Sequence, residues 1–114
     1  MAKNSRVREH FAFLTYLQTI SPRRQKVFIK VADRPILEAL SEIAINLIKR
    51  NVKLSPSEID KLRPFEEQIY QLSLKKHSIN KKKRIVQQRG GFLTALLGAV
   101  LPALISTVIN ATQS

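Results

Sequence analysis

The residues with the clearest chemistry are two groups of cations. Lys81, Lys82, Lys83 and Arg84 are consecutive, and no acidic residue lies within ten positions of them. Such a run is typical of phosphate contacts, of a nuclear import signal, or of a solvated helix face. We predict that the residues that bind nucleic acid come from this run, from Arg89 and from a second group: Arg23, Arg24, Lys26, Lys30, Lys81, Lys82, Lys83, Arg84 and Arg89.

The charge is distributed in blocks. The 114 residues carry 20 Lys and Arg against 8 Asp and Glu, a net charge of +12. Eight basic and two acidic residues lie in 1–34, and five basic and no acidic residues lie in 79–89, whereas 90–114 is uncharged. No zinc finger, basic zipper or RNP-like motif is present, so we expect binding to the nucleic-acid backbone that depends on salt and not on base sequence.

Catalytic and metal-binding patterns are missing from the sequence. There is no cysteine, and the two histidines, His10 and His77, do not belong to a cluster with ligand spacing. The three glycines are Gly90, Gly91 and Gly98, which do not form a phosphate-binding loop. We therefore expect a protein that is not an enzyme and that has no catalytic residues, metal site or cofactor.

A long apolar segment follows the cations. Residues 92–109 hold no charge, but a spanning helix needs about 20 apolar residues, and Gly98 and Pro102 interrupt this one. It could be a membrane-disrupting interfacial helix, a tail anchor, or a helix buried against a partner or in an oligomer, the last being favoured if the segment packs on the domain. Its shortness favours membrane disruption. The predicted membrane-contacting residues are Phe92, Leu93, Leu96, Leu97, Val100, Leu101, Leu104 and Ile105.

Apolar spacing of three and four predicts helices throughout. Helices are expected over about 6–20, 23–31 (with Val27 and Val31 on one side), 35–50 and 79–89, with two more on either side of Pro64. Ser21, Ser55 and Ser78 are candidate N-caps, and Ser55 begins a capping-box pattern. We expect a helical domain over about 10–88, centred on helix 35–50.

The predicted fold class is all-α: a small helical bundle with a basic helix and an apolar C-terminal helical tail. We divide the chain into a basic N-terminal helical segment (1–34), a helical core (35–78), a basic strip with a Gly–Gly junction (79–91) and an apolar tail (92–114).

The junction between cations and tail reads Gln88-Arg89-Gly90-Gly91-Phe92. On the glycines alone it is a flexible hinge. Residues 81–97, KKKRIVQQRGGFLTALL, and 39–63, ALSEIAINLIKRNVKLSPSEIDKLR, resemble small proteins of adintovirus and Polinton-type elements, and the order of parts resembles core-protein and membrane-lytic precursors of adenoviruses. The resemblance covers about residues 36–105. It implies a protease-cleavage site before Phe92, with Gln88, Gly90, Gly91 and Phe92 as recognition residues.

These observations lead to one main functional hypothesis. It is a virion-type accessory protein, in the virion or host nucleus, that binds nucleic acid non-specifically and carries an apolar peptide that a maturation protease releases onto membranes. One alternative is a tail-anchored membrane adaptor. Another is a plain nucleic-acid-binding helical domain that forms a homo-oligomer through its tail.

Overall fold

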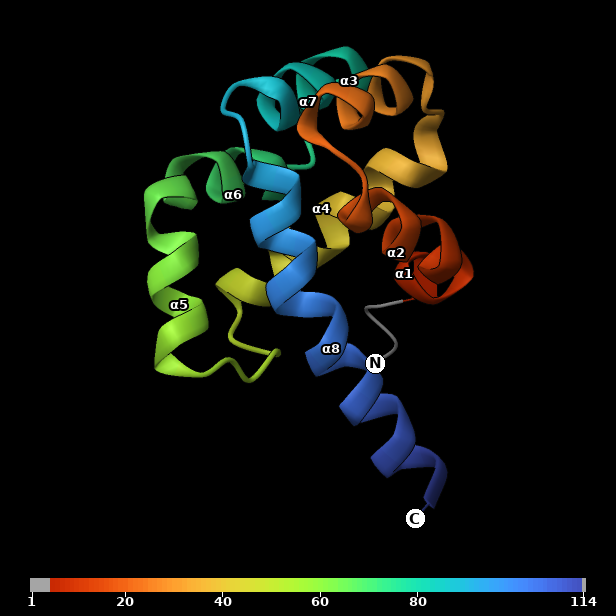
Figure 1. Cartoon of the computed structure of the whole chain (residues 1–114), viewed down its shortest axis with the longest axis vertical. Helices are drawn as coiled ribbons and strands as arrows, with labels where there is room; N and C mark the ends of the chain where they lie inside the picture. Colours follow the sequence, from red (N-terminus) through yellow and green to blue (C-terminus); the bar gives the residue numbers. More distant parts are fainter. Residues whose placement is uncertain (1–4, 114) are drawn as a thin grey trace.

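The protein is built from helices, as the sequence predicts. The computed structural model describes the backbone of residues 5–113 and the side chains of 6–103. Helices are the only regular secondary structure over 5–113, which confirms the all-α fold class. In chain order (Figure 1) they are α1 (Ser5–Glu9), α2 (Phe11–Thr19), α3 (Pro22–Val31), α4 (Arg34–Ile48), α5 (Pro56–Leu62), the 3₁₀ turn η1 (Arg63–Phe65), α6 (Glu66–Ser73), α7 (Ile79–Gln87) and α8 (Phe92–Gln113).

Three serines begin helices as expected. The Oγ of Ser21 accepts a hydrogen bond from the backbone N–H of Arg24, and Ser78 does the same with Lys81. Ser55 and Glu58 form the complete capping box of α5. These bonds satisfy N–H groups that have no partner inside the helix, so the starts of α3, α5 and α7 are fixed by local chemistry.

The expected helix over 6–20 is divided in two near His10. Helix α1, the first part, is attached to α4 by tertiary contacts. The backbone N–H of Arg6 donates to Glu42 Oε1 at 3.1 Å, and the Arg6 guanidinium lies 3.2 Å from Glu38. Burial of the Glu42 carboxyl raises its pKa, against the opposing effect of the N–H groups of Arg6 and Val7. The change of direction buries Val7.

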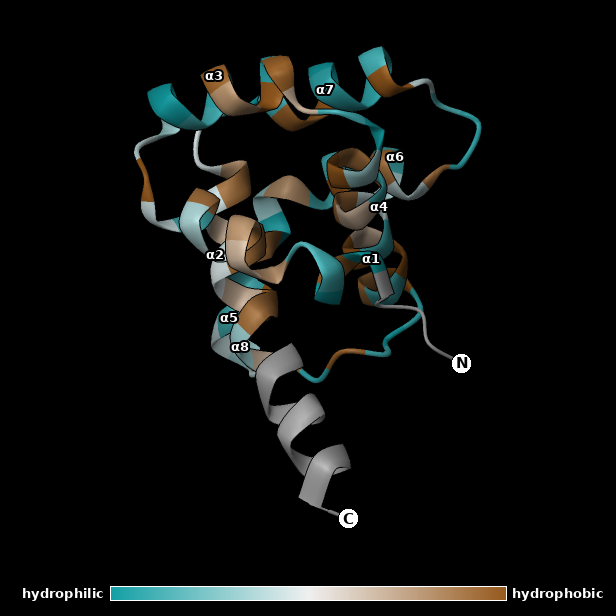
Figure 2. Ribbon diagram, turned by 90° about the vertical axis from the view of Figure 1, so that its right-hand side faces the viewer, coloured by the Kyte–Doolittle hydropathy of each residue, from teal (hydrophilic) through white to brown (hydrophobic). Residues whose placement is uncertain are grey.

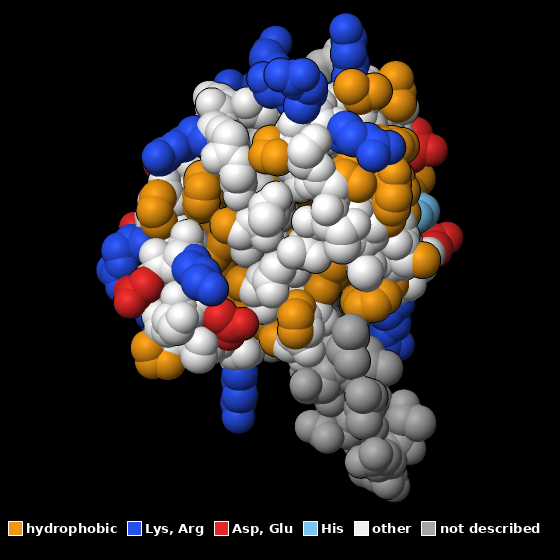
Figure 3. All heavy atoms as spheres, viewed as in Figure 1, with side chains coloured by type: hydrophobic (Ala, Val, Ile, Leu, Met, Phe, Trp, Pro, Cys, Tyr) orange, Lys and Arg blue, Asp and Glu red, His pale blue; other side chains and the backbone are white. Residues whose placement is uncertain are grey.

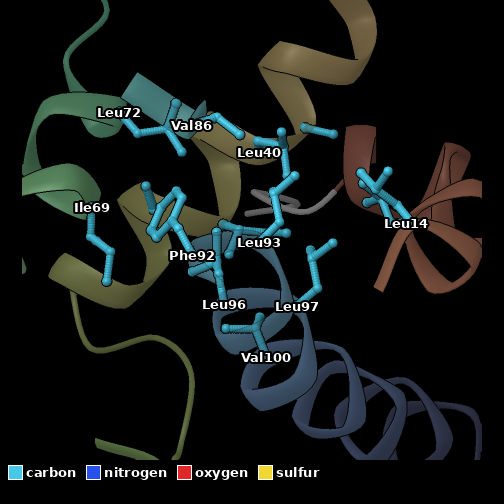
Figure 4. Close-up of a cluster of buried hydrophobic side chains, with 14 of the residues drawn as sticks. Leu14, Leu40, Ile69, Leu72, Val86, Phe92, Leu93, Leu96, Leu97 and Val100 are labelled. Carbon is cyan, nitrogen blue, oxygen red and sulfur yellow. The ribbon is translucent and has the colours of Figure 1, made fainter. Parts of the chain in front are cut away.

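Two helices form the centre of the bundle. Helix α4 was expected there, and its apolar face is buried against α1, α6 and α7. Helix α8 is the second. Figure 4 shows its first three turns among side chains from α2, α4, α6 and α7. Seven of the 22 buried hydrophobic residues in the described part of the chain belong to α8, one more than α4 contributes: Phe92, Leu93, Leu96, Leu97, Ala99, Val100 and Leu101.

The buried part of α8 contacts its neighbours through a hydrogen bond at Thr94 and packing at Gly98. Gln25 is buried, and its Nε2 donates to the Leu17 carbonyl and to Thr94 Oγ1, both at 3.0 Å, which joins α3 to α2 and α8. Gly98 faces α2, where a Cβ would lie 3.4 Å from Gln18 Nε2, an ordinary contact distance. Neither Gly98 nor the exposed Pro102 ends the helix.

Candidate nucleic-acid interface

Helices α3 and α7 lie side by side across one end of the bundle. Both views place them together, at the top of Figures 1 and 2. Lys83 Nζ donates to the carbonyl of Lys30 at 2.9 Å, and Gln87 Nε2 donates to the carbonyl of Lys26 at 3.4 Å. This order of contacts makes the two helices antiparallel. Basic blocks that lie more than 50 residues apart in the sequence are therefore brought together.

We call the cations of this pair the basic face. Five of them are exposed and two, Lys81 and Lys83, are half-buried. Neither α3 nor α7 contains an acidic residue, and Figure 3 shows basic side chains gathered over this end. The members of the basic face are Arg23, Arg24, Lys26, Lys30, Lys81, Lys83 and Arg84.

The positive charges near α7 influence the pKa of a neighbouring histidine, His77. His77 lies two residues before the start of α7, and its Nε2 is 2.8 Å from Gln71 Oε1. Burial lowers the pKa of the His77 imidazole, and the positive charges of Lys81, Lys76 and Lys82 lower it further. The cations next to α7 therefore disfavour an additional positive charge, and by the same Coulomb interaction they favour an anion.

Lys82 does not belong to the basic face, contrary to the sequence prediction. It is only 6% exposed, and burial lowers the pKa of its ammonium, although the negative charge of Glu38 partly opposes the shift. Helix geometry explains the difference. Four consecutive helical residues cover about 300° of the circumference at 100° each, so one of them must turn inward. Helical spacing from Ile85 and Val86, both buried, identifies Lys82 as that residue.

Arg89 is placed by contacts at the other end of α7. Its Nη1 donates to the carbonyl of Pro64 at 2.6 Å, and its guanidinium lies 5.3 Å from the centre of the Phe65 ring. The Phe65 ring in turn packs on Phe92, with ring centres 5.6 Å apart. Arg89 therefore fastens the junction between α7 and α8 to η1, which is a structural role distinct from the predicted phosphate contact.

Helix α3 buries a different side from the one that the sequence suggested. Val27 and Val31, expected on one side, are 62% and 75% exposed. The buried residues are Gln25 and Ile29. Phe28 packs edge-on against Phe13 of α2, so the larger apolar side chains of α3 already have partners within the protein.

Sequence reasoning missed Gln87, which helps to hold the two basic helices together. It lies one helical turn after Lys83, so both side chains reach α3 from the same side of α7. That spacing was visible in the sequence. The carbonyls that accept from these side chains could not be identified until the packing of α3 on α7 was known.

The proposed cleavage junction is a tight turn. Gln88 and Gly90 are exposed and Gly91 is half-buried, but Phe92 is fully buried and is the first residue of α8. Gly91 has a φ of +86°, and its carbonyl accepts from the N–H of Ala95. This left-handed conformation favours a glycine at position 91, whatever the role of the junction in cleavage. The bond after Gly91 leads directly into the core.

The predicted membrane-contacting residues lie mostly in the interior. Leu104 and Ile105 fall outside the described side chains, whereas the other six are at most 5% exposed. Residues 92–101 are therefore not a tail separate from the domain, and the boundary at Gly91 is not a boundary of packing. A helix that is apolar on all sides is expected in a core. Over the described residues, no helix combines the length and apolar character that crossing a bilayer requires. The six are Phe92, Leu93, Leu96, Leu97, Val100 and Leu101.

The comparisons with known proteins add no relative. No protein-family model, curated protein or solved structure matches the chain. Within the described part of the chain, no three His, Asp or Glu side chains are grouped as a metal site would need. The resemblance to adenovirus-like precursors and the absence of enzymatic activity stay predictions.

Proposed function

We propose that the protein binds nucleic acid through the basic face of α3 and α7. The observation that carries the proposal is the antiparallel packing of these helices, held by the bonds from Lys83 and Gln87 to α3 carbonyls. It collects seven cations, without an acidic residue in either helix, on one end of a folded protein. A helix of ten residues is about 15 Å long, which matches about four base-pair steps of duplex.

The chemistry of the face favours the backbone over the bases. Lys and Arg neutralise phosphates and release condensed counterions, so affinity falls as salt rises. The only exposed large apolar side chains on α3 and α7 in the described part are Val27 and Val31, and neither can stack on a base as an aromatic ring does. We therefore infer binding that is indifferent to sequence, with a salt slope of at most about 6 for seven phosphate contacts.

Nucleic acid suits this face better than a bilayer does. Helices that lie in a membrane interface present Trp, Phe or Leu to the lipid, with cations on the opposite side. In α3 the larger apolar residues, Phe28 and Ile29, point towards the protein. The exposed side of α3 that carries the cations has only two large apolar residues, Val27 and Val31, which is little apolar surface for insertion into lipid.

The test compares two variants with the same loss of charge. The first replaces four residues of the basic face by Gln, and the control replaces four exposed cations of the α4–α5 region, away from the face in Figure 1. Binding to a 20-base-pair duplex is measured by fluorescence anisotropy between 50 and 300 mM salt. The face variant is Arg23→Gln, Lys26→Gln, Lys30→Gln and Arg84→Gln, which leaves the Lys83 bond to α3 intact; the control is Lys49→Gln, Arg50→Gln, Lys53→Gln and Lys61→Gln.

The face variant is expected to lose about 100-fold in affinity at low salt and about 3 to 4 of the salt slope, because each lost phosphate contact removes about 0.9. The control should change the slope by less than about 1. Equal losses in the two variants would show that only net charge matters and would refute the proposal. Binding to anionic phosphatidylserine vesicles with no binding to duplex or single strand would also refute it.

A further inference from the structure

A groove of about 1040 Å³ opens between the end of α4, the connector 49–55, α5, η1 and α6. Its lining is mainly aliphatic, and three large side chains remain about half exposed there: Ile48 at 47%, Ile59 at 48% and Tyr70 at 51%. These are three of the six exposed large hydrophobic residues in the described part of the chain. Apolar side chains gathered in a groove in this way are typical of an interaction site.

Charges around the groove nearly balance. Arg50, Lys53 and Arg63 line it together with Glu66 and Glu67. One of these cations, Arg63, is already paired, with Asp60 at 3.1 Å. The rim therefore offers no strong field to attract a charged ligand. An uncharged apolar segment fits both its lining and its electrostatics.

The same chain supplies a segment of this chemistry. Helix α8 runs to Gln113, well beyond Leu101, the last core residue described. The sequence from Leu104 onward contains no charge, and Leu104, Ile105, Val108 and Ile109 follow the spacing of one helix face. The described lining of the groove comes from α4 to α6 and includes no α8 residue.

We propose that residues 104–109 of one copy bind in the groove of a second copy, and the reverse, to form a symmetric dimer. Each chain carries both the segment and the groove, so a two-fold axis satisfies both at once and closes the assembly. The inference does not rest on nucleic-acid binding. Where both hold, the dimer presents two basic faces to one polyanion, which raises avidity without a new contact.

Substitutions in the full-length chain test the two halves of the contact. Ile59→Asp changes the groove at an exposed position, and the double substitution Leu104→Asp with Ile105→Asp changes the segment. Val31→Asp is the matched control, since it places the same charge on an exposed aliphatic residue outside the groove. Circular dichroism confirms folding, and light scattering after gel filtration gives the mass from 1 to 100 µM.

We expect a dimer for the wild type and for Val31→Asp, and a dissociation constant raised at least tenfold for each of the other variants. A mixture of the groove variant and the segment variant should recover a weak heterodimer, because one of the two reciprocal contacts is intact. A monomeric wild type at 100 µM overturns the proposal, as does a dimer that neither variant weakens.

Cross-linking tests the contact itself and does not depend on either variant. The chain has no cysteine, so Tyr70→Cys with Val108→Cys introduces a single pair. Mild oxidation should give a covalent dimer that reducing agent dissolves. A disulfide within one chain would show that the groove is filled by its own segment, and no disulfide would show that the two never meet. Both results overturn the proposal, and so does flotation of the wild type with neutral phosphatidylcholine vesicles in place of dimerisation.

Discussion

The basic face and the first ten residues of α8 are the two extremes of composition in this chain, and the fold treats them in opposite ways. The basic face is assembled on the surface from two distant segments, joined by side chains that donate to backbone carbonyls. Residues 92–101 form one continuous helix, and most of that helix is buried. Only four residues, 88–91, separate α7 from α8.

The comparison shows that a membrane-like sequence can be explained by a protein core. Apart from α4, the helices before α8 have at most ten residues, and most of the helices before α8 are apolar on one side only. Several of these helices bury part of their apolar sides against α8, which is apolar on all sides over residues 92–101. The lack of charge in residues 92–101 then follows from burial, because an unpaired charge in the interior is very costly.

The largest expected effect concerns the buried residues 92–101 of α8. Leu96→Ala should lower the free energy of unfolding by about 2–5 kcal/mol, because it leaves a cavity where Leu96 is fully buried. Val31→Ala, at an exposed position, should change it by less than about 0.5 kcal/mol. Urea denaturation followed by circular dichroism measures both. Equal and small effects would mean that α8 is not part of the core.

The second prediction concerns cleavage between the two regions. An adenoviral-type maturation protease should cut the Gly91–Phe92 bond slowly in the native protein, because Phe92 is buried, and about 100-fold faster in Leu96→Ala, which opens more often. Mass spectrometry gives the site and rate. In native buffer the two fragments should elute together on gel filtration. Rapid cutting of the native chain with free release of residues 92–114 would instead support the hypothesis of a releasable peptide.

The third prediction separates the two glycines at the boundary. Gly91→Ala should cost about 1–2 kcal/mol, since it forces an L-residue into the left-handed region. A Cβ on Gly90 meets nothing within 4 Å, so Gly90→Ala should be neutral or raise stability by up to about 1 kcal/mol. Thermal and urea unfolding compare the pair. If both variants behaved alike, the turn would not depend on the conformation of Gly91.

The smallest effect concerns Lys82, the cation that lies on the interior side of α7. Lys82→Met should raise stability at pH 7 by up to about 1 kcal/mol, because it removes the cost of burying an ammonium, and should change duplex affinity by less than about twofold. Lys83→Met, the matched control, should reduce the salt slope by about 1. Equal losses of affinity in the two variants would show that Lys82 contributes to duplex binding as much as Lys83 does.

The dependence on pH gives Lys82 a separate signature. Its pKa is lower in the folded protein than in the unfolded chain, where it is about 10.4. Between these two values the unfolded state binds more protons, so the stability of the wild type should rise with pH across that window. Urea titrations from pH 7 to 10.5 should show this rise in the wild type and a smaller one in Lys82→Met.

Much of the fold was determined by signals that act over a few residues. The serine caps, the capping box of Ser55 and Glu58, the turn at Pro64 and the apolar spacing of α4 all predict elements that the structure contains, because each interaction lies within a helical turn or two. The sequence likewise identified which segments are basic. All seven residues of the basic face belong to the nine predicted cations, and the other two, Lys82 and Arg89, lie elsewhere.

Only the tertiary structure decided where those segments lie. Glu42 holds the start of α1 from 36 residues away, and Gln25 and Ile29, rather than Val27 and Val31, are the side of α3 that is buried. A helix that is apolar on all sides has no preferred face in its sequence. The sequence favoured a membrane for residues 92–101, but the same pattern is also compatible with a protein core. The choice depends on whether the other helices leave an apolar space for it, and that is a property of the assembled bundle.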